Sequence, residues 1–263
     1  HFGRGIVRSS NDFGLQGDDP THPDLLNWLA HQFVESGWDI KAMHRLIMSS
    51  QAYQRSSIPQ DGALLKDPLN DLFWRFDMRR LQAEEVRDSI LAVRGSLNLE
   101  MGGVSVTPPL PKIILQTASQ PGKAWGNSTP RQANRRSVYV KVKRSLQDPI
   151  LLSHDMADTD TTCPVRFTTT VPTQALTMMN GEFVNESALN FAERIRQNAG
   201  PSPREQVEKG LSLVFSRMPK PEEVKAGVRM MEEVAKAGGL SPKEALNRFA
   251  LLALNLNEFI YLD

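Results

Sequence analysis

The sequence holds a single cysteine, Cys163, so no disulfide can form within the chain. It therefore also lacks the C-x-x-C-H motif that attaches a c-type haem covalently. No apolar run reaches the roughly 18 residues that a membrane-spanning helix needs. Basic and acidic side chains nearly balance, at 31 to 30, which argues against a dedicated nucleic-acid-binding protein with its usual basic excess.

Several catalytic motifs are absent as well. The sequence contains no H-E-x-x-H, no G-x-S-x-G, no Walker-type loop and no G-x-G-x-x-G. These absences argue against zincins, α/β-hydrolases with the usual nucleophile elbow, P-loop NTPases and Rossmann enzymes.

The N-terminal part predicts two helices joined by a tight corner. Thr21 precedes Pro23, which suits a first helical turn, and we expect the Thr21 side chain to cap that helix. Gly37 is placed to end the first helix, and Asp39 to cap the second. Further segments with helical periodicity or capping signals lie at about 82–94, 173–180, 184–198, 203–216, 221–236 and 242–256.

The middle of the chain has a different character. Residues 102–135 contain four glycines and five prolines without a sustained period, and they predict a long irregular loop. Val138, Val140 and Val142 then alternate with polar or aromatic residues, which is the periodicity of a strand. The run RFTTTV at 166–171 is rich in β-branched residues and predicts a second strand.

These patterns predict a mainly α fold: a helical bundle-like domain with a small β-hairpin element and a long irregular central loop. We interpret residues 1–263 as a single domain. Its parts are a helical N-terminal part at 1–101, a loop and β element at 102–171, and a helical C-terminal part at 172–263.

The stretch RRLQAEEVRDS places Glu84, Arg87 and Asp88 on one turn of the third long predicted helix. Glu84 and Asp88 are like charges four residues apart, which repel each other unless a base lies between them. We therefore predict a buried arginine–carboxylate network that ties this helix to the central loop.

Two histidines are candidate catalytic residues. His22 would lie at a helix N-terminus, where the macrodipole disfavours the imidazolium, so a neutral His22 oriented by Asp18 or Asp19 could act as a base or ligand. The alternative is that both carboxylates shape a turn and His22 only occupies the helix entry. His154 directly precedes an acidic loop, which makes it the second candidate.

That acidic loop carries Asp155, Asp158 and Asp160, the densest set of oxygen ligands in the chain. Such carboxylates suit a hard cation such as Ca²⁺, although the spacing is not that of an EF-hand. The alternatives are a solvated loop, or a cluster neutralised by arginines, which we favour over a metal. The arginines expected to fold back on the loop are Arg135, Arg136 and Arg166.

Six basic residues and no acidic residue lie within 131–144, ahead of the acidic loop, and we call this segment the basic run. A phosphate, an anionic glycan or a neighbouring domain could dock there. The alternative is a solvated strand face whose charges protect an edge. The residues of this basic run are Arg131, Arg135, Arg136, Lys141, Lys143 and Arg144.

Several phrases, in order along nearly the whole chain, resemble the planctomycete-type PSD domain. They are HFGRGIVRSSNDFGLQGDDPTHPDLLNWLAHQFVESGWDIKAMHRLIMSSQAYQRSS, RRLQAEEVRDSILAVRGSL, RRSVYVKVKRS, TTTVPTQALTMMN and LNEFIYLD. The resemblance implies a C-terminal domain of unknown function in an exported parent protein that often carries cytochrome c-like segments. It supplies no catalytic residues.

Two classes of function remain after this reading. The first is a non-catalytic interaction or scaffold domain of an exported multidomain protein, which holds partner domains or a glycan. The alternative is an enzyme, a hydrolase of an ester, lactone or glycosidic bond assisted by Ca²⁺ or Zn²⁺, which would use the Asp155 loop and a histidine.

Overall fold

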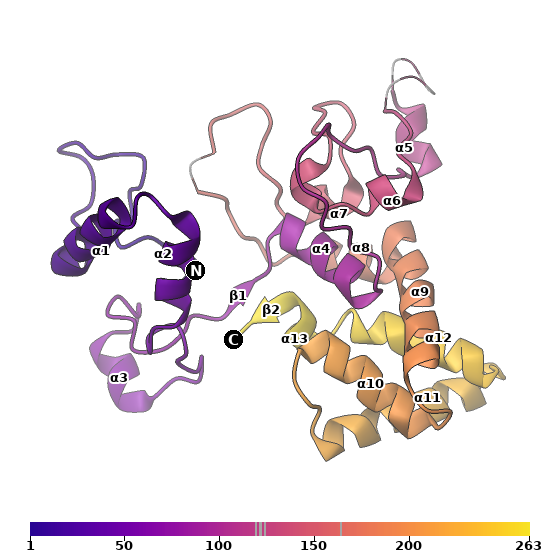
Figure 1. The fold of residues 1–263 in the computed structure, drawn as a ribbon. Helices are drawn as coiled ribbons and strands as arrows, with labels where there is room; N and C mark the ends of the chain where they lie inside the picture. The colour runs from indigo at the N-terminus through magenta and orange to yellow at the C-terminus, as the bar shows by residue number, and fades with distance from the viewer. Residues whose placement is uncertain (119, 121–122, 124, 164) are drawn as a thin grey trace. The chain divides into compact units, whose positions relative to one another are not determined.

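The computed structural model describes residues 1–118, 120, 123, 125–163 and 165–263, and it is mainly helical, as the sequence predicted (Figure 1). The chain divides into two compact units. Unit 1 comprises His1–Arg79 with Tyr261–Asp263, and unit 2 comprises Arg80–Ile260. The single-domain assignment stays a prediction. In the described residues no helix is both long and apolar enough to cross a membrane.

Unit 1 contains the predicted helix pair, α1 (Pro23–Glu35) and α2 (Ile40–Met48). Gly37 adopts a left-handed φ of 70°, and the Trp38 N–H donates to the Phe33 carbonyl at 3.0 Å, which is one bond of a Schellman motif. The Trp38 ring packs on Phe33 with centroids 5.2 Å apart. The Asp39 carboxylate accepts from the Ala42 N–H at 3.0 Å, so both the corner and the cap of α2 are confirmed.

The expected cap of α1 is wrong. His22 is the N-cap residue and makes no side-chain capping bond. The Thr21 hydroxyl lies 3.3 Å from the Ile6 carbonyl, to which the Thr21 N–H also donates at 3.0 Å. Thr21 therefore connects the start of α1 to the N-terminal segment. Its hydroxyl bonds to a carbonyl distant in sequence, whereas the local sequence pattern predicted a bond to the helix backbone.

The remainder of unit 1 is organised by aromatic rings. Phe2 packs against Tyr53 and Phe73 with centroids 5.8 and 5.0 Å away, and Tyr53 packs edge-on against Phe76 at 5.5 Å. The helices α1, α2 and α3 (Asp61–Lys66) bury no residue themselves. The aromatic cluster is thus the apolar centre of this unit, and Phe76 is its buried member.

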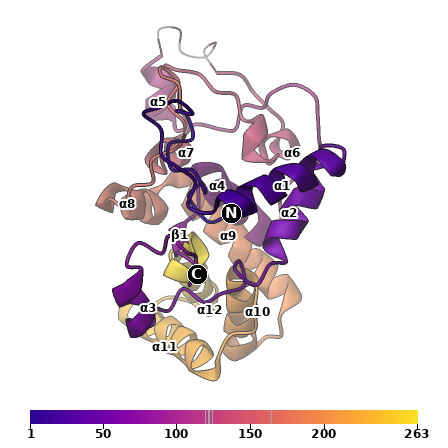
Figure 2. The same ribbon diagram turned by 90° about the vertical axis from the view of Figure 1, so that its left-hand side faces the viewer.

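Unit 2 carries the main hydrophobic core and most of the helices. Five long ones match the predicted segments: α4 (Ala83–Val93), α9 (Glu182–Asn198), α10 (Pro203–Phe215), α11 (Pro221–Gly238) and α12 (Pro242–Ala253). The other α-helices described in this unit are α5 (Lys112–Gln116), α6 (Pro130–Ala133), α7 (Pro149–Ser153), α8 (Pro172–Asn180) and α13 (Asn257–Ile260), of which α8 also matches a predicted segment. Both views place α9 to α12 together at the end of the unit that lies away from α5 (Figures 1 and 2).

Capping and close packing explain these C-terminal helices. Ser202 and Ser241 are each followed three residues later by a glutamate, which is the sequence pattern of a capping box, and they accept from the N–H groups of Glu205 and Glu244. Two glycines then let the helices approach. A Cβ atom on Gly210 would lie 2.8 Å from the Phe249 ring, and one on Gly227 would lie 2.6 Å from Val207.

The strand predicted from the alternation of Val138, Val140 and Val142 does not form. Ser137–Tyr139 form a 3₁₀ turn, η1, and Val140 makes a single parallel bridge with Val106. Val138 and Val142 are 72% and 62% exposed while Val140 is buried, so the three valines do not share a face. The turn is fixed by Asp88, whose carboxylate accepts from both the N–H and the hydroxyl of Ser137 at 2.7 Å.

Two further expectations for the middle of the chain are corrected. The run 166–171 forms no strand, because the Thr169 N–H donates to the Asp155 carboxylate at 2.8 Å instead of to a neighbouring strand. Within 102–135 two short helices occur, α5 (Lys112–Gln116) and α6 (Pro130–Ala133). The sheet that does form pairs β1 (Arg79–Arg80) with β2 (Tyr261–Leu262), where the chain passes between the units.

We predict that Gly210→Ala lowers the free energy of unfolding by about 1–3 kcal/mol, because the new methyl group overpacks the contact with Phe249. The measurement is urea denaturation followed by circular dichroism. Gly62→Ala is the matched control, since a Cβ there meets no atom within 4 Å. The control should be neutral or stabilising by up to about 1 kcal/mol. A Gly210→Ala variant as stable as the parent would contradict the packing argument.

Acid should weaken the contact between α11 and α13. Arg217 donates to Glu223 and Glu258 at 2.7–3.0 Å, and its guanidinium lowers the pKa of Glu223 to about 2. This stabilisation is complete above the ordinary value of 4.5 and is lost as the pH falls towards 2. The urea midpoint of Arg217→Gln should therefore depend less on pH between these values than that of the parent. Arg229→Gln, which removes an exposed ion pair, should follow the parent.

Candidate functional site

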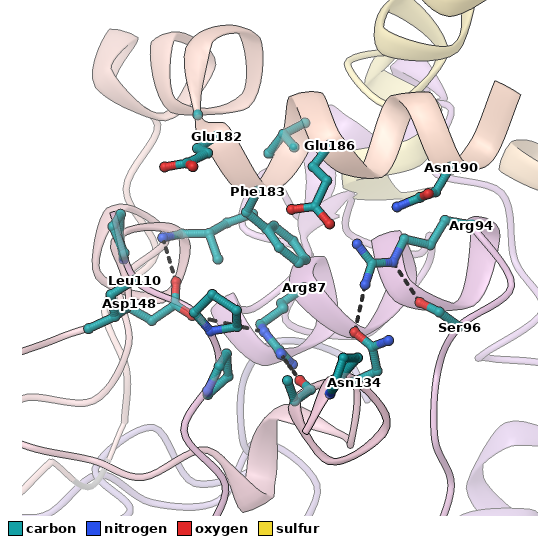
Figure 3. A pocket seen from close by; sticks show the side chains of 18 of the residues that line it. Arg87, Arg94, Ser96, Leu110, Asn134, Asp148, Glu182, Phe183, Glu186 and Asn190 are labelled. Atoms are coloured by element: carbon teal, nitrogen blue, oxygen red, sulfur yellow. Dashed lines mark hydrogen bonds and ion pairs between the residues drawn. The ribbon is translucent and has the colours of Figure 1, made fainter. Parts of the chain in front are cut away.

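Unit 2 contains a cleft of about 720 Å³. Its walls come from α4, α6, α7, α8 and α9 and from the proline-rich segment before α5 (Figure 3). Five prolines line the cleft, and each fixes the backbone angle φ at its own position. They are Pro108, Pro109, Pro111, Pro130 and Pro149.

One face of α9 supplies a wall of the cleft. The residues on this face recur every three or four positions, as one side of a helix requires. They are Phe183, Glu186, Asn190, Glu193 and Gln197. The opposite face carries the buried Ala188, Phe191 and Ile195, which pack into the core. Burial of the apolar face thus turns a fixed set of mostly polar side chains towards the cleft.

Arg87, on α4, lines the floor of the cleft and is only 1% exposed. Its Nη2 donates to the Ala133 carbonyl at 2.7 Å, and its Nη1 donates to the Arg135 carbonyl and the Ser137 hydroxyl at 3.2 and 3.1 Å. Its Nε finds no hydrogen-bond acceptor among the residues that the structure describes. Two corners of the guanidinium are therefore fixed by the protein, and the third is not.

The carboxylate nearest to that third corner belongs to Asp148. Its Oδ2 lies 4.0 Å from Arg87 Nε, which is too long for a hydrogen bond, while its Oδ1 accepts from the Ile150 N–H at 3.1 Å and caps α7. Burial raises the pKa of the Asp148 carboxyl, and the charge of Arg87 opposes that shift. Burial likewise lowers the pKa of Arg87. The charged form of each group is thus destabilised by desolvation, and no direct hydrogen bond between the two groups offsets that cost.

Arg94 occupies the other side of the cleft. Its Nε donates to Ser96 Oγ at 2.6 Å, and its two terminal nitrogens donate to Ser187 Oγ at 3.0 Å and to Asn134 Oδ1 at 2.6 Å. The guanidinium carbons of Arg87 and Arg94 lie 5.6 and 5.5 Å from the centroid of the Phe183 ring. Figure 3 shows the ring beside both arginines, and the two distances put both guanidinium groups within cation–π range.

The charges around the cleft nearly cancel. Three arginines and four carboxylates line it, so its walls hold no strong potential of one sign. These residues are Arg87, Arg94, Arg194, Asp148, Glu182, Glu186 and Glu193. Arg194 is engaged with the protein itself, since its Nη1 donates to the Ala92 and Val93 carbonyls at the end of α4.

The family model for PSD1, described as a protein of unknown function (DUF1553), matches residues 1–231. The chain belongs to this family. The match confirms the resemblance that the sequence phrases indicated, and every residue that lines the cleft falls within the matched range. No curated protein and no solved structure matches the chain.

In this PSD1-family chain, the predicted network around Arg87 is present but differs in its partners. Arg87 forms an ion pair with Asp88 at 3.7 Å, as predicted, but its hydrogen bonds go to two carbonyls and a hydroxyl. The carboxylate of Asp88 also binds Ser137, and that of Glu84 pairs with Arg166. The helix is thus tied to the loop as predicted, through backbone acceptors that the sequence does not display.

Arg135 in the basic run is a structural residue rather than an open docking group. Its guanidinium donates to the carbonyls of Glu100, Gly102 and Val104 and lies 3.8 Å from the centroid of the Tyr139 ring. Arg136 lies 5.9 Å from the same ring, while Arg144 pairs with Asp160 at 2.8 Å and is mostly exposed. Docking of an anion or partner at Arg136, Lys141, Lys143 and Arg144 stays a prediction.

The acidic loop gives each carboxylate its own partners. Asp155 pairs with Arg80 at 2.6 Å, and Asp160 pairs with Arg144. Asp158 accepts from the Asp160 N–H and the Thr161 hydroxyl, and these bonds lower its pKa. Arginines do neutralise the loop, but they are not the predicted Arg135, Arg136 and Arg166. Among the described residues no group of three or more His, Cys, Asp or Glu side chains is placed to hold a metal ion.

Neither candidate histidine is among the residues that line the cleft. His154 is 2% exposed and caps the end of α7, where its Nδ1 lies 2.9 Å from the Ile150 carbonyl. Burial lowers the pKa of His154, which favours the neutral ring. His22 belongs to unit 1, with its Nδ1 3.0 Å from the Thr21 hydroxyl and its ring 5.5 Å from that of Phe73, and Asp19 is exposed. A catalytic role for these residues stays a prediction.

Sequence reasoning missed Arg94, Asp148 and Phe183 as site residues. Asp148 precedes Pro149 and shows the ordinary signature of a helix start, so it suggests a cap and not a cleft. Phe183 is the one usable signal, since it is an aromatic residue on the otherwise polar face of α9. An apolar ring at such a position indicates that the face is covered or binds something.

We predict that Arg135→Lys loosens residues 99–106, because an ammonium group cannot reproduce the fork that gathers three carbonyls. The free energy of unfolding should fall by about 1–3 kcal/mol. Amide hydrogen exchange should speed up at residues 99–106 and stay unchanged on α11. Arg131→Lys, at an exposed position of the same run, is the control and should change neither quantity. Equal exchange in both variants would show that the carbonyl contacts do not hold this segment.

Proposed function

We propose that this chain is a non-catalytic binding domain of a larger exported protein, and that the cleft of unit 2 receives a polar ligand such as a glycan. The supporting observation is the pair of guanidinium groups that lie 5.6 and 5.5 Å from the centroid of the Phe183 ring, together with Asp148 in the same cleft. Clefts of roughly 300–1,000 Å³ with a few convergent polar groups are typical ligand sites.

Fixed geometry favours binding. All three nitrogens of the Arg94 guanidinium donate to protein oxygens, and so do the two terminal nitrogens of Arg87. Both side chains are therefore oriented before a ligand binds. Such preorganisation lowers the entropy cost of binding. Arginine stays protonated at neutral pH, so these groups orient and attract a ligand and do not exchange protons with it. An exported parent protein and a cytochrome c-like neighbour are part of the same proposal, on the family resemblance.

A second candidate is hydrolysis of a glycosidic bond, and one observation favours it. Asp148 is a buried cleft carboxyl with a raised pKa, which is the property of a general acid. Release of reducing ends that disappears in Asp148→Asn would support this alternative. Its metal-assisted form, with Ca²⁺ or Zn²⁺ at Asp155, Asp158 and Asp160, would in addition be abolished by EDTA.

We predict that the full chain is retarded in affinity electrophoresis by at least one soluble polysaccharide from a neutral, a uronate and a sulfated class. Asn190→Trp should weaken that binding at least tenfold, because the bulky ring fills the cleft from an exposed position of α9. Leu189→Trp is the matched control on the same helix, exposed but outside the cleft lining, and should bind as the parent does. No retardation by any class, or equal loss in both variants, would overturn the proposed function.

A further inference from the structure

The gap between Arg87 and Asp148 has a defined chemistry. Arg87 Nε is a buried donor without an acceptor in the described chain, and Asp148 Oδ2 is a buried acceptor 4.0 Å away. Both residues line the cleft, as Figure 3 shows. A buried donor left without a partner destabilises the protein, and a charged one does so more strongly, so a group that satisfies both atoms gains binding energy at this point.

We propose that the cleft binds a neutral saccharide, one hydroxyl of which accepts from Arg87 Nε and donates to Asp148 Oδ2. This inference rests on the proposed function and specifies its ligand. An oxygen at an ordinary hydrogen-bond distance of about 2.8 Å from each atom spans a 4.0 Å separation with a bent N···O···O angle of roughly 90°.

The two flanking charges select a hydroxyl over other groups. A ligand carboxylate or sulfate accepts from Arg87 Nε but meets the negative charge of Asp148 and has no proton to donate to it. An ammonium group donates to Asp148 but is repelled by Arg87. A hydroxyl carries one donor and two acceptor positions, so it serves both partners at once without a net charge.

The rest of the cleft extends this selection to a sugar. The balanced charges of the walls give no advantage to an anion. Phe183 offers an apolar surface beside the arginines, against which the C–H face of a sugar ring can pack. Side-chain amides, which both donate and accept as hydroxyl groups require of their partners, also line the cleft. They are Asn134, Asn190 and Gln197.

The experiment leaves the protein unchanged, because Arg87 and Asp148 also hold the fold. The Nε–H resonances of uniformly ¹⁵N-labelled full chain are followed while maltotriose, cellotriose, xylotriose or mannotriose is added, with trigalacturonate as the anionic comparison. Arg94 Nε is the internal control, since it already donates to Ser96. For the trisaccharide that binds, analogues with single hydroxyls replaced by fluorine are then titrated, because fluorine cannot donate a proton.

We expect at least one neutral trisaccharide to move the Arg87 Nε–H resonance saturably, with a smaller change at Arg94 and weaker binding of trigalacturonate. Fluorine at one position should weaken binding at least tenfold, the loss expected for a hydrogen bond to a charged group. The inference is overturned if no neutral trisaccharide moves the Arg87 resonance, as when water bridges the two groups permanently. It is also overturned if trigalacturonate binds more tightly, or if all fluorinated analogues bind within twofold of the parent sugar.

The two proposals fail in different ways. If a polysaccharide retards the chain and Asn190→Trp abolishes this while Arg87 Nε stays unmoved, the cleft is a binding site but the bridging hydroxyl is wrong. If neither polysaccharides nor trisaccharides bind, both proposals fall.

Discussion

A positive charge in the interior of unit 2 organises much of what surrounds it. The guanidinium of Arg87 is buried, and burial of an unpaired charge would cost several kcal/mol. The protein meets this requirement with the carbonyls of Ala133 and Arg135 and the hydroxyl of Ser137. Residues 133–137 must therefore lie against α4, whatever their own preference for helix or strand.

The same logic extends outward from that contact. Once residue 135 is held against α4, its own guanidinium gathers the carbonyls of residues 100, 102 and 104. Arg94, two turns after Arg87 on the chain, reaches Asn134 from the end of the same helix. Segments poor in regular structure are thus ordered by arginine–oxygen bonds, where a sheet would use ladder hydrogen bonds.

The helices α10 to α12 form the packed support of α9, which lines the cleft. Their starts are fixed by local chemistry, and their contacts are close because Gly210 and Gly227 leave room for Phe249 and Val207. Tight packing of one face of α9 sets the rotation of that helix about its axis. The cleft-facing side chains are consequently placed by the core behind them, which is the support that a preorganised binding site needs.

Sequence reasoning succeeded where the determining contacts are local. The capping boxes at Ser202 and Ser241, the cap at Asp39 and the glycine corner at Gly37 involve residues a few positions apart, so their patterns can be read directly. Helix periodicity then gave most of the long helices to within a few residues.

The errors share a cause, which is a partner distant in sequence. The Thr21 hydroxyl donates to the carbonyl of Ile6 instead of capping its own helix. Asp88 accepts from Ser137 and so fixes a turn where the valines predicted a strand. Asp155 pairs with Arg80 and not with one of the predicted arginines. The cleft was hidden for the same reason. Its main groups, Arg87, Asp148 and Phe183, come from segments dozens of residues apart, and no spacing relates them.

These groups were also hidden because each has an evident structural task. Asp148 caps α7, Arg87 fastens α4 to the loop, and Arg94 joins that helix to α9 through Ser187. A residue with a structural task is not usually suspected of a second one. Yet Arg87 Nε has no acceptor among the described residues, and Asp148 Oδ2 lies 4.0 Å from it. Both charged groups are already desolvated in the folded protein. A ligand that hydrogen-bonds to both of them therefore gains these bonds without a further desolvation cost for the protein.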